Sequence, residues 1–243
     1  MKNYPRTSKY DIKWIQENWM GPHPLWLMEE LCKHLDLRPG MKVLDMGCGK
    51  GLTSVFLAKE YGVTVFANDL WISATDNLLR FEEAGVADRV FPIHAEAHAL
   101  PYANGFFDVA ISIDSYHYYG TDELYFTDVF AKLVKPGGQF GIVAPGLIRE
   151  FEMGYPPALK EHWDDGFFTF HSSNWWRRLW EKTDIVEIIA CYDIENPKEI
   201  WYPWANWLVD NQKYSGDKNL LDADTQNEMT FIAMAAVKKG AHS

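Results

Sequence analysis

The stretch Val43-Leu44-Asp45-Met46-Gly47-Cys48-Gly49-Lys50-Gly51 decides how this sequence folds. Its apolar start predicts a buried strand, and the run over residues 52–58 predicts a helix. Glycines stand between the two at every second position, and glycine lacks the Cβ that disfavours positive φ and keeps a ligand from the backbone. The free N–H groups at the start of the helix favour a carboxylate or phosphate. The pattern therefore predicts a strand, a tight turn and a helix that cradle a nucleotide-like ligand.

The position of the third glycine separates two kinds of nucleotide-binding loop. A dinucleotide-binding turn has the spacing G-x-G-x-x-G, which would place this glycine at position 52. Leu52 occupies that position, and Gly51 gives the register G-x-G-x-G instead. The spacing disfavours a nicotinamide-dependent dehydrogenase, an alternative that predicts affinity for the dinucleotide.

Strand and helix patterns alternate from residue 41 onward. Apolar runs predict strands over 42–45, 63–67, 90–93, 107–113 and 139–144, and periodic runs predict helices over 51–61, 71–84 and 122–134. Such alternation predicts an α/β fold, a Rossmann-like, doubly wound and mostly parallel sheet with helices on both faces. Ligands bind such sheets beyond the carboxyl ends of the strands. We therefore expect functional residues after Asp45, Asn68, Ile93 and Ile113.

An acid and an apolar residue follow the second predicted strand. A carboxylate at Asp69 can accept hydrogen bonds from both ribose hydroxyls, and Leu70 can cover one face of a purine. The alternative is that Asp69 caps the helix that follows, because aspartate is a favoured N-cap residue. The number of residues between the glycine loop and Asp69 favours binding of the ribose over capping of the helix.

Composition narrows the classes of protein. The chain has 243 residues and a net charge of −11, which argues against a nucleic-acid surface. Its three cysteines are far apart and form no C-x-x-C pair, so neither a disulfide framework nor a metal site is expected. The first residues lack an apolar signal segment, and no apolar stretch is long enough to cross a membrane. We expect a cytoplasmic protein without membrane insertion that acts on a small molecule.

Several segments together resemble a known family. Residues 43–51, Asp69, 95–101, 107–113 and 133–138 resemble, in order, the motifs of methyltransferases of the ubiquinone/menaquinone-biosynthesis type, which depend on S-adenosyl-L-methionine (SAM). They are also similar to small-molecule relatives of the cyclopropane-fatty-acid synthases. The resemblance covers residues 41–145 and implies the class I methyltransferase fold with SAM as cofactor. That fold has a seven-stranded sheet whose last strand, expected here over 229–237, is antiparallel and inserted beside the fifth.

The resemblance also assigns residues around the cofactor. It implies that Asp45 helps to hold the ammonium group of SAM, often through water. The methionine part would be bordered by Gly47, Gly49, Gly51 and the backbone around Ile113 and Asp114.

The adenosine part would lie nearer the second and third strands. Asp69 would bind the ribose, Leu70 would pack on adenine, and Glu96 with the Ala97 backbone would contact the adenine edge. The family commonly has Gly-Asp where this sequence has Ala95-Glu96, so the longer Glu96 is expected to reach adenine from a slightly different backbone position.

Methyl transfer needs a base only when the acceptor arrives protonated. His117 follows the central strand, and histidine titrates near neutral pH, so His117 and Tyr116 are the predicted catalytic residues. The alternative is that His117 is a structural loop residue hydrogen-bonded to backbone. A protein that binds SAM without turnover, as a sensor or scaffold, is the competing functional class, and it would leave no room beside the methyl group.

We expect one domain over residues 1–243. It would comprise an N-terminal helical lid (1–40), a SAM-binding core (41–145), a cap insertion (146–172) and the C-terminal part of the sheet (173–243). Trp14 and Trp19 either belong to the lid or pack on the sheet edge, whereas Trp176 and Trp180 are expected to pack on the sheet. The many aromatic residues beyond residue 145 suit either a cationic or amine acceptor or an apolar ring or acyl chain.

Overall fold

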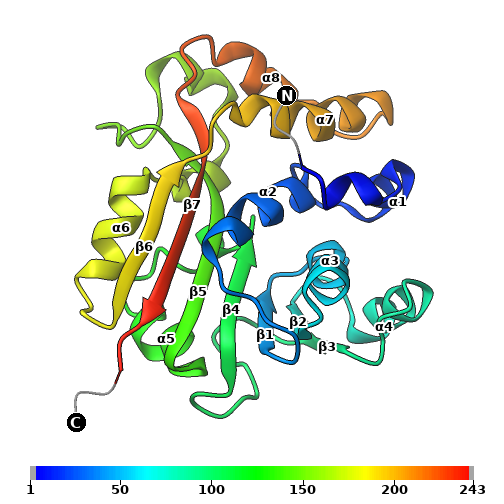
Figure 1. Ribbon diagram of the computed structural model, residues 1–243. Helices are drawn as coiled ribbons and strands as arrows, with labels where there is room; N and C mark the ends of the chain where they lie inside the picture. The colour runs from blue at the N-terminus through cyan, green and yellow to red at the C-terminus, as the bar shows by residue number, and fades with distance from the viewer. Residues whose placement is uncertain (1–3, 241–243) are drawn as a thin grey trace.

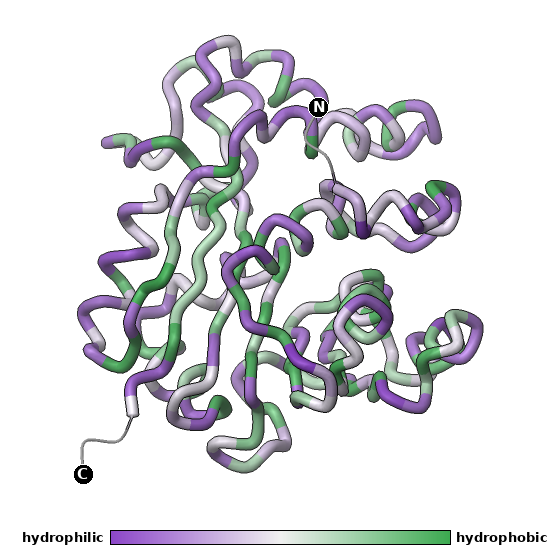
Figure 2. Tube along the Cα trace, viewed as in Figure 1, coloured by the Kyte–Doolittle hydropathy of each residue, from purple (hydrophilic) through white to green (hydrophobic). Residues whose placement is uncertain are grey.

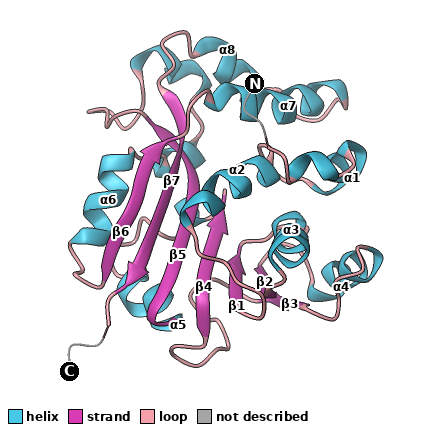
Figure 3. Cartoon of the chain, in the orientation of Figure 1, coloured by secondary structure: helices cyan, strands magenta, loops and turns pink. Residues whose placement is uncertain are grey.

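The strands form a single sheet in the order β3-β2-β1-β4-β5-β7-β6. The computed structural model describes residues 4–240, and Figures 1 and 3 show the sheet crossing the molecule. Pairing is parallel except at β7, which runs antiparallel to both neighbours, β5 and β6. The structure therefore confirms the predicted doubly wound fold and its antiparallel last strand. The strands are β1 (Lys42–Met46), β2 (Thr64–Asp69), β3 (Val90–His94), β4 (Phe107–Ile113), β5 (Val134–Leu147), β6 (Val186–Asp193) and β7 (Met229–Lys238).

Helices cover both faces of the sheet because neighbouring strand residues point to opposite sides. Val43 packs in the core beneath α2 and α3, while Leu44 packs in a second core beneath α5 and α6. Trp176 and Trp180 are fully buried in this second core, as predicted. Figure 2 shows hydrophobic residues along the strands. The helices are α1 (Ile12–Asn18), α2 (Pro24–Leu31), α3 (Leu52–Tyr61), α4 (Ala74–Glu83), α5 (Ala131–Leu133), α6 (Ser173–Glu181), α7 (Pro197–Asp210) and α8 (Gly216–Ala223).

The helix predicted over residues 122–134 is wrong in length and type. The chain forms a π-helical turn, η4 (Phe126–Phe130), followed by the single turn of α5. Phe126 and Phe130 are both buried against Phe140, and the wider turn accompanies the burial of these two bulky rings. The strand predicted over residues 139–144 also starts earlier than expected, because residues 135–138 belong to β5, which begins at Val134.

Two helices complete the end of the molecule where the parallel strands finish. The aromatic segment over residues 201–207 lies within α7, and α8 follows it, a helix that the sequence pattern did not predict. Figure 1 shows both helices beyond the carboxyl end of β4. Two short 3-10 helices, η5 (Pro157–His162) and η6 (Asp165–Thr169), contain most of the regular structure in the predicted cap insertion. Within residues 4–240, no helix is both long and apolar enough to cross a membrane.

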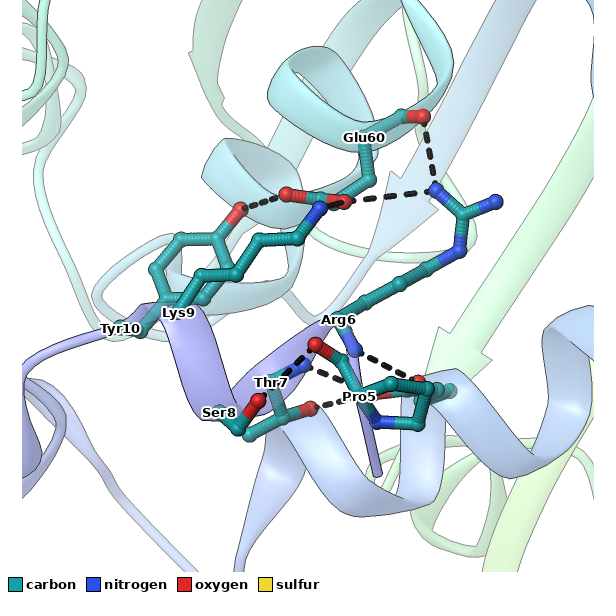
Figure 4. Close-up of polar contacts among 8 residues, drawn as sticks. Pro5, Arg6, Thr7, Ser8, Lys9, Tyr10 and Glu60 are labelled. Carbon is teal, nitrogen blue, oxygen red and sulfur yellow. Dashed lines mark hydrogen bonds and ion pairs between the residues drawn. The ribbon is translucent and has the colours of Figure 1, made fainter. Parts of the chain in front are cut away.

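Polar contacts fix the start of the chain to α2 and α3 (Figure 4). The carboxylate of Glu60 in α3 accepts hydrogen bonds from the side chains of Arg6 and Lys9 and from the Tyr10 hydroxyl. Glu29 of α2 is buried and accepts hydrogen bonds from the backbone N–H groups of Arg6 and Thr7 at 3.0 and 2.8 Å. A buried carboxylate that receives several donors is well stabilised. These contacts place the following helix, α1, beside the glycine loop.

Candidate active site

A cavity lies at the carboxyl ends of β1, β2 and β4. Its volume is about 1020 Å³, including the part that is open to solvent. The wall opposite the strands is the turn between α1 and α2, which contributes Trp19, Met20 and Gly21. This position agrees with the expectation that ligands bind beyond the carboxyl ends of parallel strands.

The three glycines of the loop have different structural roles. Gly47 and Gly49 line the cavity with φ of 71° and 55°. A Cβ on Gly47 would lie 1.9 Å from Ser115 Oγ, so no side chain fits there. Gly51 lies outside the cavity lining, where it is the N-cap of α3 and a Cβ would lie 2.3 Å from the Phe81 ring.

Backbone hydrogen bonds hold this loop in place. The N–H groups of Gly47 and Cys48 both donate to the Asn68 carbonyl oxygen, at 2.8 and 2.9 Å. The Gly49 N–H donates to Asp69 Oδ2 at 2.8 Å. Because these partners all come from the end of β2, the loop and the second strand form one rigid unit.

Asp45 is buried behind the glycine loop. Its Oδ2 accepts hydrogen bonds from Thr53 Oγ1 at 2.7 Å and Ser54 Oγ at 2.6 Å, both in the first turn of α3. Its Oδ1 is buried and accepts no hydrogen bond from residues 4–240. Burial raises the pKa of this carboxyl to about 6, although the two hydroxyls oppose the shift. Asp45 is not part of the cavity lining.

Asp69 lines the cavity and also organises the backbone. Its Oδ1 accepts from the N–H groups of Trp71 and Ile72 at 2.7 and 2.9 Å, in addition to the bond from Gly49. The N-cap of α4 is Ser73 rather than Asp69, because the Ser73 hydroxyl accepts from the Asp76 N–H. Asp69 is therefore not the N-cap of this helix, and that alternative is wrong. The carboxylate of Asp69 instead stabilises the turn that precedes the helix.

The residues predicted at the adenine end line the cavity as well. Leu70 and Trp71 are 53% and 68% exposed at its mouth. Ala97 is nearly buried on the opposite side, and Glu96 beside it receives the His98 backbone N–H at 2.9 Å. The structure thus brings Asp69, Leu70, Glu96 and Ala97 together around one end of the cavity.

Asp114 lies at the end of β4 and faces the cavity. Its φ is 52°, in the left-handed region that aspartate tolerates better than most residues. Its backbone N–H donates to the Val143 carbonyl oxygen at 2.8 Å, but its carboxylate accepts no hydrogen bond from residues 4–240. Burial, and then the negative charge of Asp217, raise the pKa of Asp114 to about 8. A Cβ on Gly21 would lie 2.1 Å from Asp114 Oδ2, so the α1–α2 turn encloses this side chain.

The two residues predicted to be catalytic do not line the cavity. Tyr116 is fully buried against Trp176 and Phe130, in the core beneath α6. His117 is 2% exposed, its Nδ1 has no hydrogen-bond partner among residues 4–240, and burial lowers its pKa to about 3. Both groups are therefore placed in the protein interior rather than beside the cavity.

Their neighbours line the cavity instead. Tyr119 places its hydroxyl 3.1 Å from Ser112 Oγ and 3.3 Å from Ser115 Oγ, and Tyr118 is 55% exposed at the mouth. Neither tyrosine was among the site residues predicted from the sequence. The sequence does contain the aromatic run Tyr116-His117-Tyr118-Tyr119. It does not indicate in which direction each of these side chains points.

Comparisons with known proteins agree with this geometry. Residues 43–138 match the model of a methyltransferase domain. The chain is 34% identical over 122 residues to the methyltransferase GfsG of Streptomyces halstedii, which is 48% of this chain and 42% of that protein. It is 31% identical over 117 residues to the 27-O-demethylrifamycin SV methyltransferase of Amycolatopsis mediterranei, covering 48% of this chain and 43% of that protein. The matches thus span less than half the length of these two relatives.

Solved structures extend the likeness over the whole fold. The phosphoethanolamine N-methyltransferase 2 of Haemonchus contortus in complex with SAM has a TM-score of 0.75 at 21% identity, over 97% of this chain and 58% of that chain. The [4+2]-cyclase SpnF has a TM-score of 0.73 at 17% identity, over 89% of this chain and 82% of that chain. At these identities, the likeness shows the fold alone.

Proposed function

We propose that the protein is a SAM-dependent methyltransferase, because residues 43–138 match the model of a methyltransferase domain and the fold resembles that of solved methyltransferases. The acceptor would be a nitrogen or oxygen of a small organic molecule. One observation carries the proposal, namely that a single cavity joins a glycine loop with positive φ to Asp114, whose carboxylate accepts no hydrogen bond from residues 4–240. The site for the methyl donor and a group that can accept a proton then lie in the same cavity.

The residues present fit SAM. Gly47 leaves bare backbone where a Cβ could not be accommodated, and Leu52 and Thr53 at the N-terminus of α3 line the same cavity. The orphaned Oδ1 of Asp45 is a buried acceptor behind the loop that a water or an ammonium group would satisfy. Asp69 and Leu70 would hold the ribose and adenine, as predicted from the sequence.

Bound SAM would supply a methyl group that is bonded to a positively charged sulfur. When a lone pair of the acceptor attacks this methyl group, the sulfur would leave as a neutral thioether. The protein has to position the acceptor and remove its proton. Positioning alone can contribute about 7–11 kcal/mol to lowering the barrier. The wall formed by Trp19, which is 3% exposed, and by Met20 limits the access of water from the α1–α2 side.

Asp114 is the group best suited to hold the acceptor's proton. An ordinary carboxylate is a weak base at neutral pH, but a pKa of about 8 makes Asp114 a matched acceptor for the proton of an ammonium or phenol. His117 is less suited, because its pKa of about 3 makes its imidazole a weak base and because it does not line the cavity. We therefore assign the proton-accepting role to Asp114.

The test is methyl transfer from SAM labelled with tritium in its methyl group. Purified protein is incubated with separate pools of primary amines, phenols, alcohols and carboxylic acids, and labelled product and S-adenosylhomocysteine are measured. We expect both to form with an amine or phenol pool. Saturable SAM binding without transfer to any pool would instead support the sensor or scaffold alternative, and absence of SAM binding would refute both.

A further inference from the structure

A chain of hydroxyl groups lies beside the glycine loop. The Ser112 hydroxyl donates to the Met46 carbonyl oxygen at 2.9 Å. The Tyr119 hydroxyl lies 3.1 Å from Ser112 Oγ and 3.3 Å from Ser115 Oγ. Ser115 and Tyr119 line the cavity, whereas Ser112 is fully buried near the end of β4. The chain therefore runs from the protein interior to the cavity wall.

Each of these hydroxyls has one proton, so the chain can have only one direction. Ser112 uses its proton for the Met46 carbonyl oxygen, which cannot donate, and its own oxygen must accept from Tyr119. Tyr119 then has no proton left, so Ser115 must donate to the Tyr119 oxygen. Burial raises the pKa of the Tyr119 hydroxyl, which therefore keeps its proton near neutral pH. As a result, Ser115 Oγ can offer only lone pairs to a ligand in the cavity.

The glycine loop next to Ser115 is also poor in free donors. A Cβ on Gly47 would lie 1.9 Å from Ser115 Oγ, so the serine oxygen lies against the bare face of the loop. The backbone N–H groups of residues 47–49 all donate to the end of β2. Behind the same loop, Asp45 Oδ1 is buried and accepts no hydrogen bond from residues 4–240. Acceptors gather here, so a ligand has to bring the donors.

The methionine part of SAM carries an ammonium group, which is only a donor, and a carboxylate, which is only an acceptor. A carboxylate beside Ser115 would meet lone pairs and no proton, whereas an ammonium group would be accepted. We propose that Ser115 recognises the ammonium group of the cofactor, and that Tyr119 and Ser112 are positioning residues that keep the serine proton turned away from it. This inference rests on the proposed function and deepens it, because it names the residues that select for the amino group.

The experiment compares two ligands that differ in one group. S-Adenosylhomocysteine carries the ammonium group, and its deamino analogue has hydrogen in that place. Each is titrated by calorimetry into the purified protein, and the ratio of the two dissociation constants measures the preference for the ammonium group. We expect the wild type to bind S-adenosylhomocysteine at least about tenfold more tightly, as for a hydrogen-bonded charged group. In Ser115→Ala this ratio should fall at least about threefold, because only the ammonium group loses an acceptor.

A second variant tests the direction of the chain. In Tyr119→Phe the Ser115 proton loses its acceptor and is free to turn toward the cavity, so the ratio should fall at least about twofold although Ser115 is intact. Tyr116→Phe is the matched control. Tyr116 lies in the neighbouring turn, and its hydroxyl is buried but takes no part in the chain, so the ratio should stay at the wild-type value.

The outcomes separate this inference from the proposed function. A wild type that binds both ligands equally, or a Ser115→Ala variant that loses affinity for both to the same extent, would overturn recognition by Ser115 and leave methyltransferase function standing. An unchanged ratio in Tyr119→Phe would overturn the positioning role of the chain. Failure of S-adenosylhomocysteine itself to bind the wild type would instead count against the proposed function.

Discussion

The two ends of the cavity are built in different ways. At the cofactor end, the contacts come from backbone atoms within a few residues of a strand end, and the Gly47, Cys48 and Gly49 N–H groups all bond to the end of β2. At the acceptor end, side chains come from segments far apart in the sequence, such as Met20 and Asp114. The charged residues also differ, because Lys50, Asp69 and Glu96 line the cofactor end, whereas Asp114 lines the acceptor end. A site built from backbone can be recognised in a sequence motif, whereas a site built from distant side chains cannot.

The largest effect is expected from adding a single carbon at the cofactor end. Gly47→Ala would place a Cβ 1.9 Å from Ser115 Oγ, at a φ of 71° that alanine adopts with strain. The loop must shift, so we expect the affinity for S-adenosylhomocysteine to fall at least about a hundredfold, equivalent to roughly 2.7 kcal/mol. Calorimetric titration measures the change.

A second glycine provides the control for strain alone. Gly137 has a φ of 75°, and no atom beyond its chain neighbours lies within 4 Å of the place that a Cβ would occupy. Gly137→Ala should cost about 1–2 kcal/mol of folding free energy and leave cofactor affinity unchanged. If both variants lose binding equally, the cradle at Gly47 has no special role.

At the acceptor end, the leading prediction concerns the proton on Asp114. Its raised pKa means that the basic form appears only as pH rises through about 8, so kcat/KM should increase over that range. Asp114→Asn should lower kcat/KM by about 10²–10⁴-fold and remove this rising limb. An unchanged pH profile in the variant would show that another group accepts the proton.

The same substitution should stabilise the protein without ligand. The folded-state pKa of Asp114, about 8, lies above the ordinary aspartate value, so its contribution to stability is fully present below about pH 4 and is lost as pH rises toward 8. Asparagine does not titrate. The unfolding free energy of Asp114→Asn should therefore exceed that of the wild type by a margin that grows between pH 4 and 8 and reaches the order of a few kcal/mol. Urea unfolding at several pH values tests this, and a margin independent of pH would contradict it.

The smallest effect is expected at the indoles that orient Asp217. Trp204→Phe removes a hydrogen bond of 3.0 Å to Asp217 and keeps an aromatic ring, so the free energy of unfolding, measured with urea, should fall by about 0.5–1.5 kcal/mol, the range of one net hydrogen bond. Trp207 stacks on Trp204, and among residues 4–240 its indole N–H has no hydrogen-bond partner, so Trp207→Phe is the matched control and should lower the free energy of unfolding less. Similar losses in both variants would assign the effect to packing.

The sequence predicted most of the fold because its signals are local. The apolar runs, the glycine spacing and the acid after β2 each act within a few residues, and the structure confirms the doubly wound, mostly parallel sheet that these signals predict. The π-helical turn at Phe126–Phe130 and the early start of β5 were not predicted, because burial of particular rings decided them.

Side-chain directions after β4 could not be predicted in the same way. Tyr116–Tyr118 form a 3-10 turn, η3, in which each residue is rotated by about a third of a turn from the last. Tyr116 therefore points to the core, His117 lies against Phe170, and Tyr118 reaches the cavity. Neighbouring positions in this turn therefore differ in whether the side chain is buried in the core or lines the cavity.

The central claim is that the cavity at the glycine loop binds SAM. Its most direct test is calorimetric titration of the purified protein with SAM, S-adenosylhomocysteine and the nicotinamide dinucleotide. The account predicts one-to-one binding of the first two with micromolar dissociation constants, about −8 kcal/mol, and no binding of the dinucleotide. Binding of the dinucleotide, or no binding of either SAM or S-adenosylhomocysteine, would contradict it.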